Sequence, residues 1–140
     1  MQVTVLEETM ADANQPKEDE NAPDFRSRCS IARSLELIGD KWTLLIVRDL
    51  MWHGKTTFQA LQNSEERVPT NILSTRLKKL VELGLVTKAP YQNRPVRYRY
   101  ELTETGGSLE PVLLSLMAWG HGNLGGGHYD PVTGENTSPQ

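Results

Sequence analysis

The sequence predicts a mainly α fold (α+β by content) whose helices are followed by a two-stranded β-hairpin. Apolar residues recur at helical spacing in successive stretches before residue 84. A strongly alternating segment rich in β-branched and aromatic residues, Val96 to Leu102, follows a polar turn and predicts the second strand of the hairpin. A further apolar stripe after residue 103 predicts one last helix.

The composition is that of an ordinary globular protein. A length of 140 residues suits a single domain. No apolar run reaches the length of a membrane span, and the first residues lack the basic and apolar regions of a secretory signal. The single cysteine cannot form an internal disulfide, so we expect a cytoplasmic protein with no membrane partner.

The net charge of −3 conceals a segregation along the chain. Residues 1–25 carry a net charge of −6, residues 26–102 carry +7, and residues 103–140 carry −4. A basic middle between two acidic ends favours a nucleic-acid partner, which the isoelectric point of the whole chain would not indicate.

The first elements follow from periodicity and from residues that stop or cap helices. Residues 1–25 are polar and acidic, and we expect them to be a disordered N-terminal segment. A short helix is predicted from Cys29 to Ile38, ended by Gly39, and Asp40 caps a second helix over residues 41–52 that is apolar nearly all round and therefore central. Thr56 or Thr57 caps a third helix over residues 57–64.

The next stretch, Val68 to Gly84, predicts an amphipathic helix with a basic outer face. Leu73, Leu77, Leu80 and Val81 form its apolar stripe. Short polar side chains near its start and cations further along match the needs of a helix in the DNA major groove. The alternative is an ordinary surface helix with a solvated face, since basic amphipathic helices are common.

The chain then predicts a strand over 85–89, a polar turn over 90–95 and the return strand over 96–102. Two short helices, the second of them basic, followed by an Arg-rich hairpin predict a winged helix-turn-helix with a two-stranded wing. The last helix is predicted from Thr103 to Leu116, continuing toward Trp119, although Gly106 and Gly107 weaken its start. Residues 122–140 are glycine-rich and polar, and we expect a flexible C-terminal tail.

Several segments in this order resemble the HxlR-type winged-helix transcriptional regulators, relatives of the MarR group. They are CSIARSLELIGDKWTLLIVRDL, TTFQALQ, TNILSTRLKKLVELGLV, RYRYELTETG and a helix ending in AWG. The resemblance implies one DNA-binding and dimerisation domain over 26–121. It also implies a homodimer formed through the first and last helices, which places a recognition helix of about 69–83 in the major groove and a wing of about 90–97 on the backbone or minor groove.

The resemblance and the residue types together give the candidate DNA contacts. Base readout is assigned to Asn71, Ser74, Thr75 and Arg76, and general phosphate affinity to Lys78, Lys79 and Arg94. The full set of candidate DNA-binding residues comprises Thr57, Thr70, Asn71, Ser74, Thr75, Arg76, Lys78, Lys79, Arg94 and Arg97.

Two further residues each have two interpretations. Cys29 precedes a helix and follows Arg28, which favours a thiolate and a sensor of oxidants or electrophiles. The more common use of a free cysteine is a structural thiol, here buried at the dimer interface. Trp42 could line a pocket for a small-molecule effector, although large aromatic side chains more often belong to the core.

The function predicted is a homodimeric, sequence-specific regulator of transcription that binds a double-stranded DNA operator, and we expect it to act as a repressor. A winged helix that binds only protein is the alternative. No nucleophile–base pair, cofactor loop or metal-ligand spacing is present in the sequence, so we expect no enzyme, no cofactor and no metal.

Overall fold

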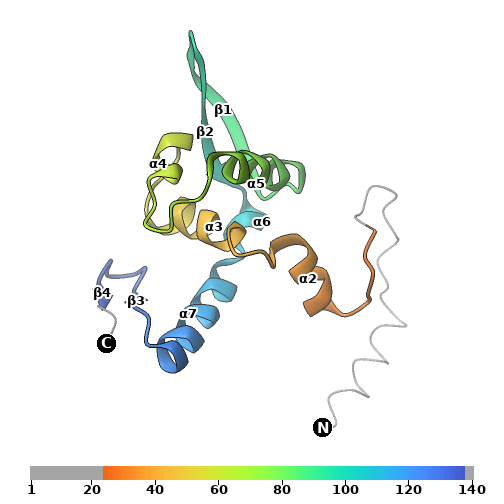
Figure 1. The fold of residues 1–140 in the computed structure, drawn as a ribbon, viewed down its shortest axis with the longest axis vertical. Coiled ribbons are helices and arrows are strands. Elements are labelled where there is room, and N and C mark those ends of the chain that lie inside the picture. Colours follow the sequence, from red (N-terminus) through yellow and green to blue (C-terminus); the bar gives the residue numbers. More distant parts are fainter. Residues whose placement is uncertain (1–23, 138–140) are drawn as a thin grey trace. The chain divides into compact units, whose positions relative to one another are not determined.

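The structure, a computed structural model, describes residues 24–137 and has the predicted mainly α fold with a two-stranded wing (Figure 1). The elements are α2 (Ser30–Ile38), α3 (Thr43–Trp52), α4 (Phe58–Gln62), α5 (Thr70–Glu82), β1 (Val86–Asn93), β2 (Val96–Leu102), α6 (Glu104–Gly107), α7 (Glu110–Leu124), β3 (His128–Tyr129) and β4 (Asn136–Thr137). Within residues 24–137, none of these helices has the length and apolar character needed to cross a membrane.

The chain divides between Glu36 and Leu37 into two compact units. The predicted disordered segment over 1–25 lies outside the described residues except at positions 24 and 25. In the first unit, the Arg33 guanidinium donates to the Ser27 carbonyl at 2.7 Å and lies over the Phe25 ring. These contacts hold Phe25 and Ser27, which precede α2, against the helix.

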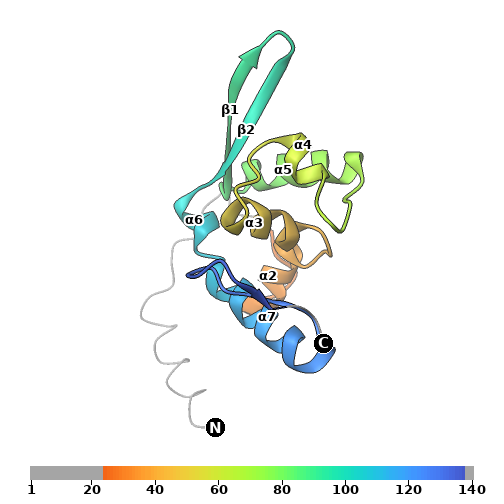
Figure 2. The ribbon, with the colours of Figure 1, turned by 90° about the vertical axis from the view of Figure 1, so that its left-hand side faces the viewer.

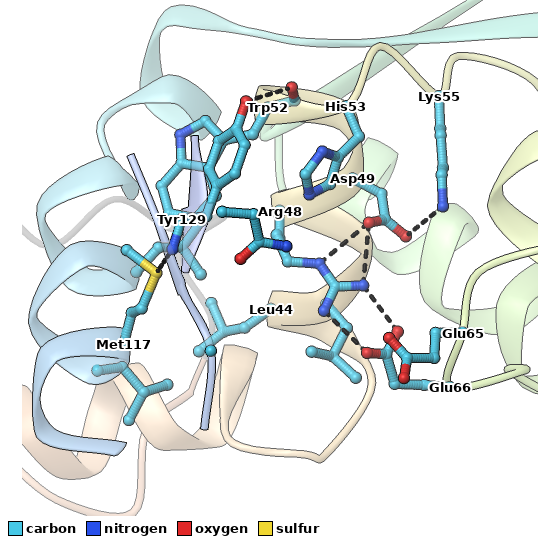
Figure 3. Close-up of a pocket in the computed structure, with 15 residues that line it drawn as sticks. Leu44, Arg48, Asp49, Trp52, His53, Lys55, Glu65, Glu66, Met117 and Tyr129 are labelled. Atoms are coloured by element: carbon cyan, nitrogen blue, oxygen red, sulfur yellow. Dashed lines mark hydrogen bonds and ion pairs between the residues drawn. The ribbon is translucent and has the colours of Figure 1, made fainter. Parts of the chain in front are cut away.

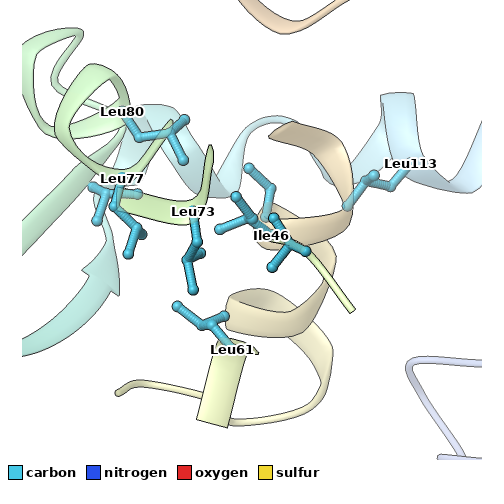
Figure 4. Packing of buried hydrophobic residues seen from close by; sticks show 9 residues of the cluster. Ile46, Leu61, Leu73, Leu77, Leu80 and Leu113 are labelled. Carbon is cyan, nitrogen blue, oxygen red and sulfur yellow. The ribbon is translucent and has the colours of Figure 1, made fainter. Parts of the chain in front are cut away.

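The core of the second unit lies where α3, α4 and α5 meet, and it extends to the base of the wing and to α7 (Figure 4). The side chains of Leu73, Leu77 and Leu80 on α5 are buried, as the predicted stripe requires. Leu61 of α4 and Ile46 of α3 face them. Burial of a side chain of this size contributes about 1.5–3 kcal/mol, so this stripe fixes which face of α5 points outward.

The wing is longer than predicted. β1 and β2 are antiparallel partners from Val86 opposite Leu102 to Asn93 opposite Val96, so the turn at Arg94 and Pro95 is much shorter than the predicted loop over 90–95. A proline fits an edge strand, where its missing N–H costs no ladder bond, and the register shifts between Pro90 and Gln92. Figures 1 and 2 both show this hairpin extending away from α4 and α5.

The last predicted helix is divided into α6 and α7. Thr103 caps α6 by accepting the Gly106 N–H at 3.1 Å. A Cβ atom added to Gly106 would lie 2.1 Å from the Leu85 carbonyl oxygen, so glycine permits the close approach of α6 to the segment between α5 and β1. Of the two glycines that weaken a continuous helix, Gly106 thus serves packing, whereas a Cβ atom at Gly107 would meet nothing within 4 Å. The helix α7 begins only at Glu110.

The C-terminal segment differs from the expected flexible tail. α7 continues to Leu124, and Gly125 ends it in the left-handed conformation. β3 and β4 then pair, with His128 opposite Thr137. The Tyr129 ring packs against Trp52 with ring centroids 5.5 Å apart, so this short hairpin covers part of α3.

Candidate nucleic-acid interface

The helix α5 separates its side chains into a buried face and an exposed polar face. Thr70, Asn71, Ser74, Thr75 and Lys78 are exposed, whereas the leucine stripe is buried. The Thr75 hydroxyl donates to the Asn71 carbonyl at 2.8 Å, which leaves its oxygen free to accept from a ligand. The exposed side chains are short near the start of the helix and cationic toward its end, the order that base readout and phosphate contact require.

The start of α5 is connected to the preceding helix by side-chain contacts. Thr57 caps α4 by accepting the Ala60 N–H at 3.2 Å, so this candidate DNA contact already has a structural role. Gln62, at the end of α4, donates to the Thr70 hydroxyl at the start of α5. This hydrogen bond joins the two helices of the helix-turn-helix directly.

A buried carboxylate holds the turn between α4 and α5. Asp49 of α3 is only 2% exposed, and its Oδ2 accepts a hydrogen bond from the Ser64 hydroxyl in that turn. Lys55 Nζ donates to Ser64 Oγ at 3.0 Å and lies 3.9 Å from Asp49 Oδ2. The charge of Asp49 is therefore balanced within the fold, and the turn is tied to the central helix.

The guanidinium of Arg48 connects Asp49 to Glu66, which lies in the same turn (Figure 3). It donates to Asp49 Oδ1 at 3.0 Å and to both carboxylate oxygens of Glu66 at 3.0 and 2.7 Å. These hydrogen bonds from Arg48 lower the pKa of Glu66. Glu66 thus serves the fold and is not a free anion beside α5.

Arg76, predicted to read bases, forms an ion pair with Asp40 at the start of α3, with Nε 2.8 Å from Oδ2. The same carboxylate accepts the N–H groups of Trp42 and Thr43, so Asp40 satisfies donors at the start of α3, although the helix begins two residues later than predicted and Trp42 occupies its N-cap position. Partial burial raises the pKa of Asp40, but these hydrogen bonds and the Arg76 charge outweigh it and lower the pKa to about 2. Arg76 therefore braces α5 against α3.

The wing carries exposed cations and aromatic rings. Arg94 lies in the turn and Arg97 on β2, and both are exposed. Lys88 Nζ lies 4.5 Å from the centre of the Tyr98 ring, and the Arg99 guanidinium lies 5.5 Å from the Tyr91 ring. These rings hold the cations Lys88 and Arg99 close to the sheet.

The base of the wing is anchored to the helix-turn-helix. The Tyr100 N–H donates to the Thr56 carbonyl at 2.7 Å, and Thr57 forms a bridge with Arg99. The wing and α4 are thereby held in a fixed relation.

The remaining predicted residues lie as follows. Lys79 is partly exposed on α5, and Cys29 is exposed immediately before α2. Trp42 is half-buried and packs against the core. It does not line the cavity that lies between α3 and α7.

Sequence reasoning did not find the Arg48–Asp49–Ser64–Glu66 cluster. A usable signal was present, because Arg48 and Asp49 are the only charged residues of the mostly apolar helix α3, and a buried charge needs a partner.

The comparisons with known proteins agree with this geometry. A family model described as HxlR-like helix-turn-helix matches residues 37–127. An uncharacterized HTH-type transcriptional regulator of Mycobacterium tuberculosis is 43% identical over 91 residues, which are 65% of this chain and 56% of that protein. The chain thus spans little more than half the length of this curated relative.

Solved structures are similar over the same region. The crystal structure of the HTH-type transcriptional regulator YtcD of Bacillus subtilis superposes with a TM-score of 0.62 at 32% identity, covering 69% of this chain and 97% of that chain. The redox regulator HypR in its reduced form superposes with a TM-score of 0.60 at 30% identity, covering 69% of this chain and 94% of that one.

The Asp40–Arg76 pair predicts a pH-dependent stability. The pKa of Asp40 is lower in the folded state than its ordinary 3.8, so the pair stabilises the fold above pH 4 and this contribution is lost as the pH falls toward 2. Asp40→Asn keeps a capping side chain but removes the charge, and we expect a loss of roughly 0.5–1 kcal/mol at pH 7.

Chemical unfolding followed by circular dichroism at pH 7, 4 and 2.5 measures this difference. The gap between wild type and Asp40→Asn should narrow as the pH falls. Glu82→Gln, an exposed change on α5, is the control and should not alter the pH profile. A gap that stays constant from pH 7 to 2.5 would show that the pair does not stabilise the fold.

Proposed function

The chain belongs to the HxlR-like helix-turn-helix family, and we propose that it is a homodimeric transcriptional regulator that represses promoters by binding a specific DNA operator. In this proposal α5 enters the major groove, and the turn of the wing at Arg94 lies on the neighbouring backbone or minor groove. Regulators of the helix-turn-helix type recognise DNA without an enzymatic reaction, and DNA is the partner that the family implies.

The observation that carries the proposal is the exposed polar face of α5. Asn71, Ser74 and Thr75 stand on the surface of a helix whose opposite face is fixed by buried leucines. The amide of Asn71 can donate to and accept from the edge of adenine in a bidentate contact. Lys78 then supplies charge for phosphates on the same helix.

Exposed apolar residues support the homodimer. On α7, Leu116 is 54% exposed and Trp119 is 60% exposed, and Val112 lies one turn earlier on the same face. On α2, Ile31 is 72% exposed and Leu35 follows one turn later. Contiguous apolar faces of this kind on a water-exposed surface are typical of interaction sites. We therefore assign α2 and α7 to the interface between two copies.

The surroundings of Cys29 support modulation through its thiol. The backbone N–H groups of Ala32 and Ile31, in the first turn of α2, lower the pKa of the exposed Cys29 thiol. A lower pKa increases the fraction of the reactive thiolate at neutral pH. With one cysteine per chain, oxidation would form an adduct or a disulfide between two copies. The similarity to the redox regulator HypR favours this role.

Binding to the protein's own upstream DNA tests the proposal. In fluorescence anisotropy, Asn71→Ala should lose roughly 5- to 150-fold in preference for the operator over a scrambled duplex, because one bidentate base contact contributes about 1–3 kcal/mol. Lys78→Ala should instead weaken both duplexes alike and reduce the salt slope by about 1.

Glu82→Gln, on the same helix, serves as the control and should keep the operator preference. Wild-type protein that binds operator and scrambled DNA equally, or Asn71→Ala with unchanged preference, would contradict the assignment of α5. Binding to a protein partner without binding to any duplex would favour the protein-interaction alternative.

The thiol hypothesis has its own test. Diamide should release wild-type protein from the operator, whereas Cys29→Ser should stay bound, because serine forms neither an adduct nor a disulfide under these conditions. Dithiothreitol should restore binding of the wild type. Equal release of wild type and Cys29→Ser would assign Cys29 a structural role.

A further inference from the structure

A cavity of about 600 Å³ lies between α3, α7, the α4–α5 turn and the C-terminal hairpin (Figure 3). Its volume is within the usual range for small-molecule sites. Tyr129 and Asn136 contribute to its lining, and both follow the residues 37–127 that match the family. The cavity is therefore completed by a part of this chain that the family domain does not include.

One wall of the cavity is aromatic and apolar. Trp52 and Tyr129 lie with ring centroids 5.5 Å apart, and the Tyr129 N–H contacts Met117 Sδ of α7 at 3.2 Å. Leu44 and Leu113 complete this wall. The wall offers flat π surfaces held in place by the hairpin and by two helices.

The opposite wall is polar and has an excess of negative charge. Asp49, Glu65 and Glu66 line it together with the cations Arg48 and Lys55. The Arg48 guanidinium is already occupied by Asp49 and Glu66, and Lys55 donates to Ser64.

Glu65 and His53 complete the electrostatics of the cavity. Among the described residues Glu65 has no hydrogen bond or ion pair, so its carboxylate is available to a ligand. Burial lowers the pKa of His53, which favours the neutral form of this lining side chain. An anionic ligand would meet no unused cation here, whereas a cationic ligand would meet an unpaired carboxylate.

We propose that this cavity binds a lipophilic monovalent cation with aromatic rings, which places its rings against Trp52 and Tyr129 and its positive centre toward Glu65. Aromatic rings attract one another beyond the area that they bury, and the negative charge of Glu65 attracts the positive centre of the ligand. The two walls thus select the same ligand by shape and by charge.

A ligand in the cavity would affect the position of α5 through Glu66. Arg48 and Glu66 hold the turn that precedes α5, and both line the cavity. A cation beside Glu65 and Glu66 competes with Arg48 for the acidic side chains and so changes the position of the turn. This coupling rests on the proposed function, whereas the binding site itself does not.

Isothermal titration with tetraphenylphosphonium and tetraphenylborate tests the site, because the two ions have nearly the same size and opposite charge. Wild-type protein should bind the cation and not the borate. Tyr129→Leu should bind the cation about 2- to 10-fold more weakly, from the lost contact between aromatic rings. Glu65→Gln, at an exposed residue, should lose affinity by a similar factor, and Glu82→Gln should lose none.

Equal binding of the two ions, or a preference for the borate, overturns the proposal, and so does full cation affinity in Glu65→Gln. The operator arm is separate: tetraphenylphosphonium should change operator affinity in wild type but not in Glu65→Gln. Cation binding with unchanged operator affinity contradicts the coupling and leaves the site standing. Cation binding by a protein that binds no DNA contradicts the proposed function alone.

Discussion

The placement of α5 depends on how the fold satisfies the buried carboxylate of Asp49. An unpaired charge at this depth would cost several kcal/mol, so removing a side chain that balances Asp49 would strongly destabilise the fold. Ser64 and Arg48 supply hydrogen bonds, and Lys55 supplies a nearby charge. Because Ser64 belongs to the turn before α5, the requirement for neutralisation also sets the conformation of that turn.

Three further sets of contacts fix the orientation of α5. The buried leucines decide which face is inward, the Asp40–Arg76 pair holds the middle of the helix, and Gln62 holds its first residue. The wing is attached at Thr56 by one backbone hydrogen bond. A polar surface made of a helix and a hairpin is thus kept in one arrangement by a few polar contacts around a small core, which favours recognition of a ligand with a fixed spacing.

Periodicity predicted the elements well because each helix buries one face, and the stripe of α5 could be read directly from its leucines. Tertiary pairing could not be predicted in the same way. Arg76 has the residue type of a base contact, but its partner Asp40 lies 36 positions earlier, so the sequence offers no local sign of the pair. The same holds for Arg48 with Glu66, 18 positions apart. The length of β1 and the C-terminal hairpin were missed because proline- and glycine-rich segments mimic loops when their tertiary partners are unknown.

The central claim is that two copies of this chain present α5 to successive turns of one DNA duplex. Hydroxyl-radical footprinting of the protein on its own upstream DNA measures this geometry directly. The account predicts two protected half-sites related by approximate two-fold symmetry, with centres separated by one helical turn, about 10 base pairs, or by a multiple of it. A single protected patch, or no protection at salt concentrations where the protein is bound, would contradict it.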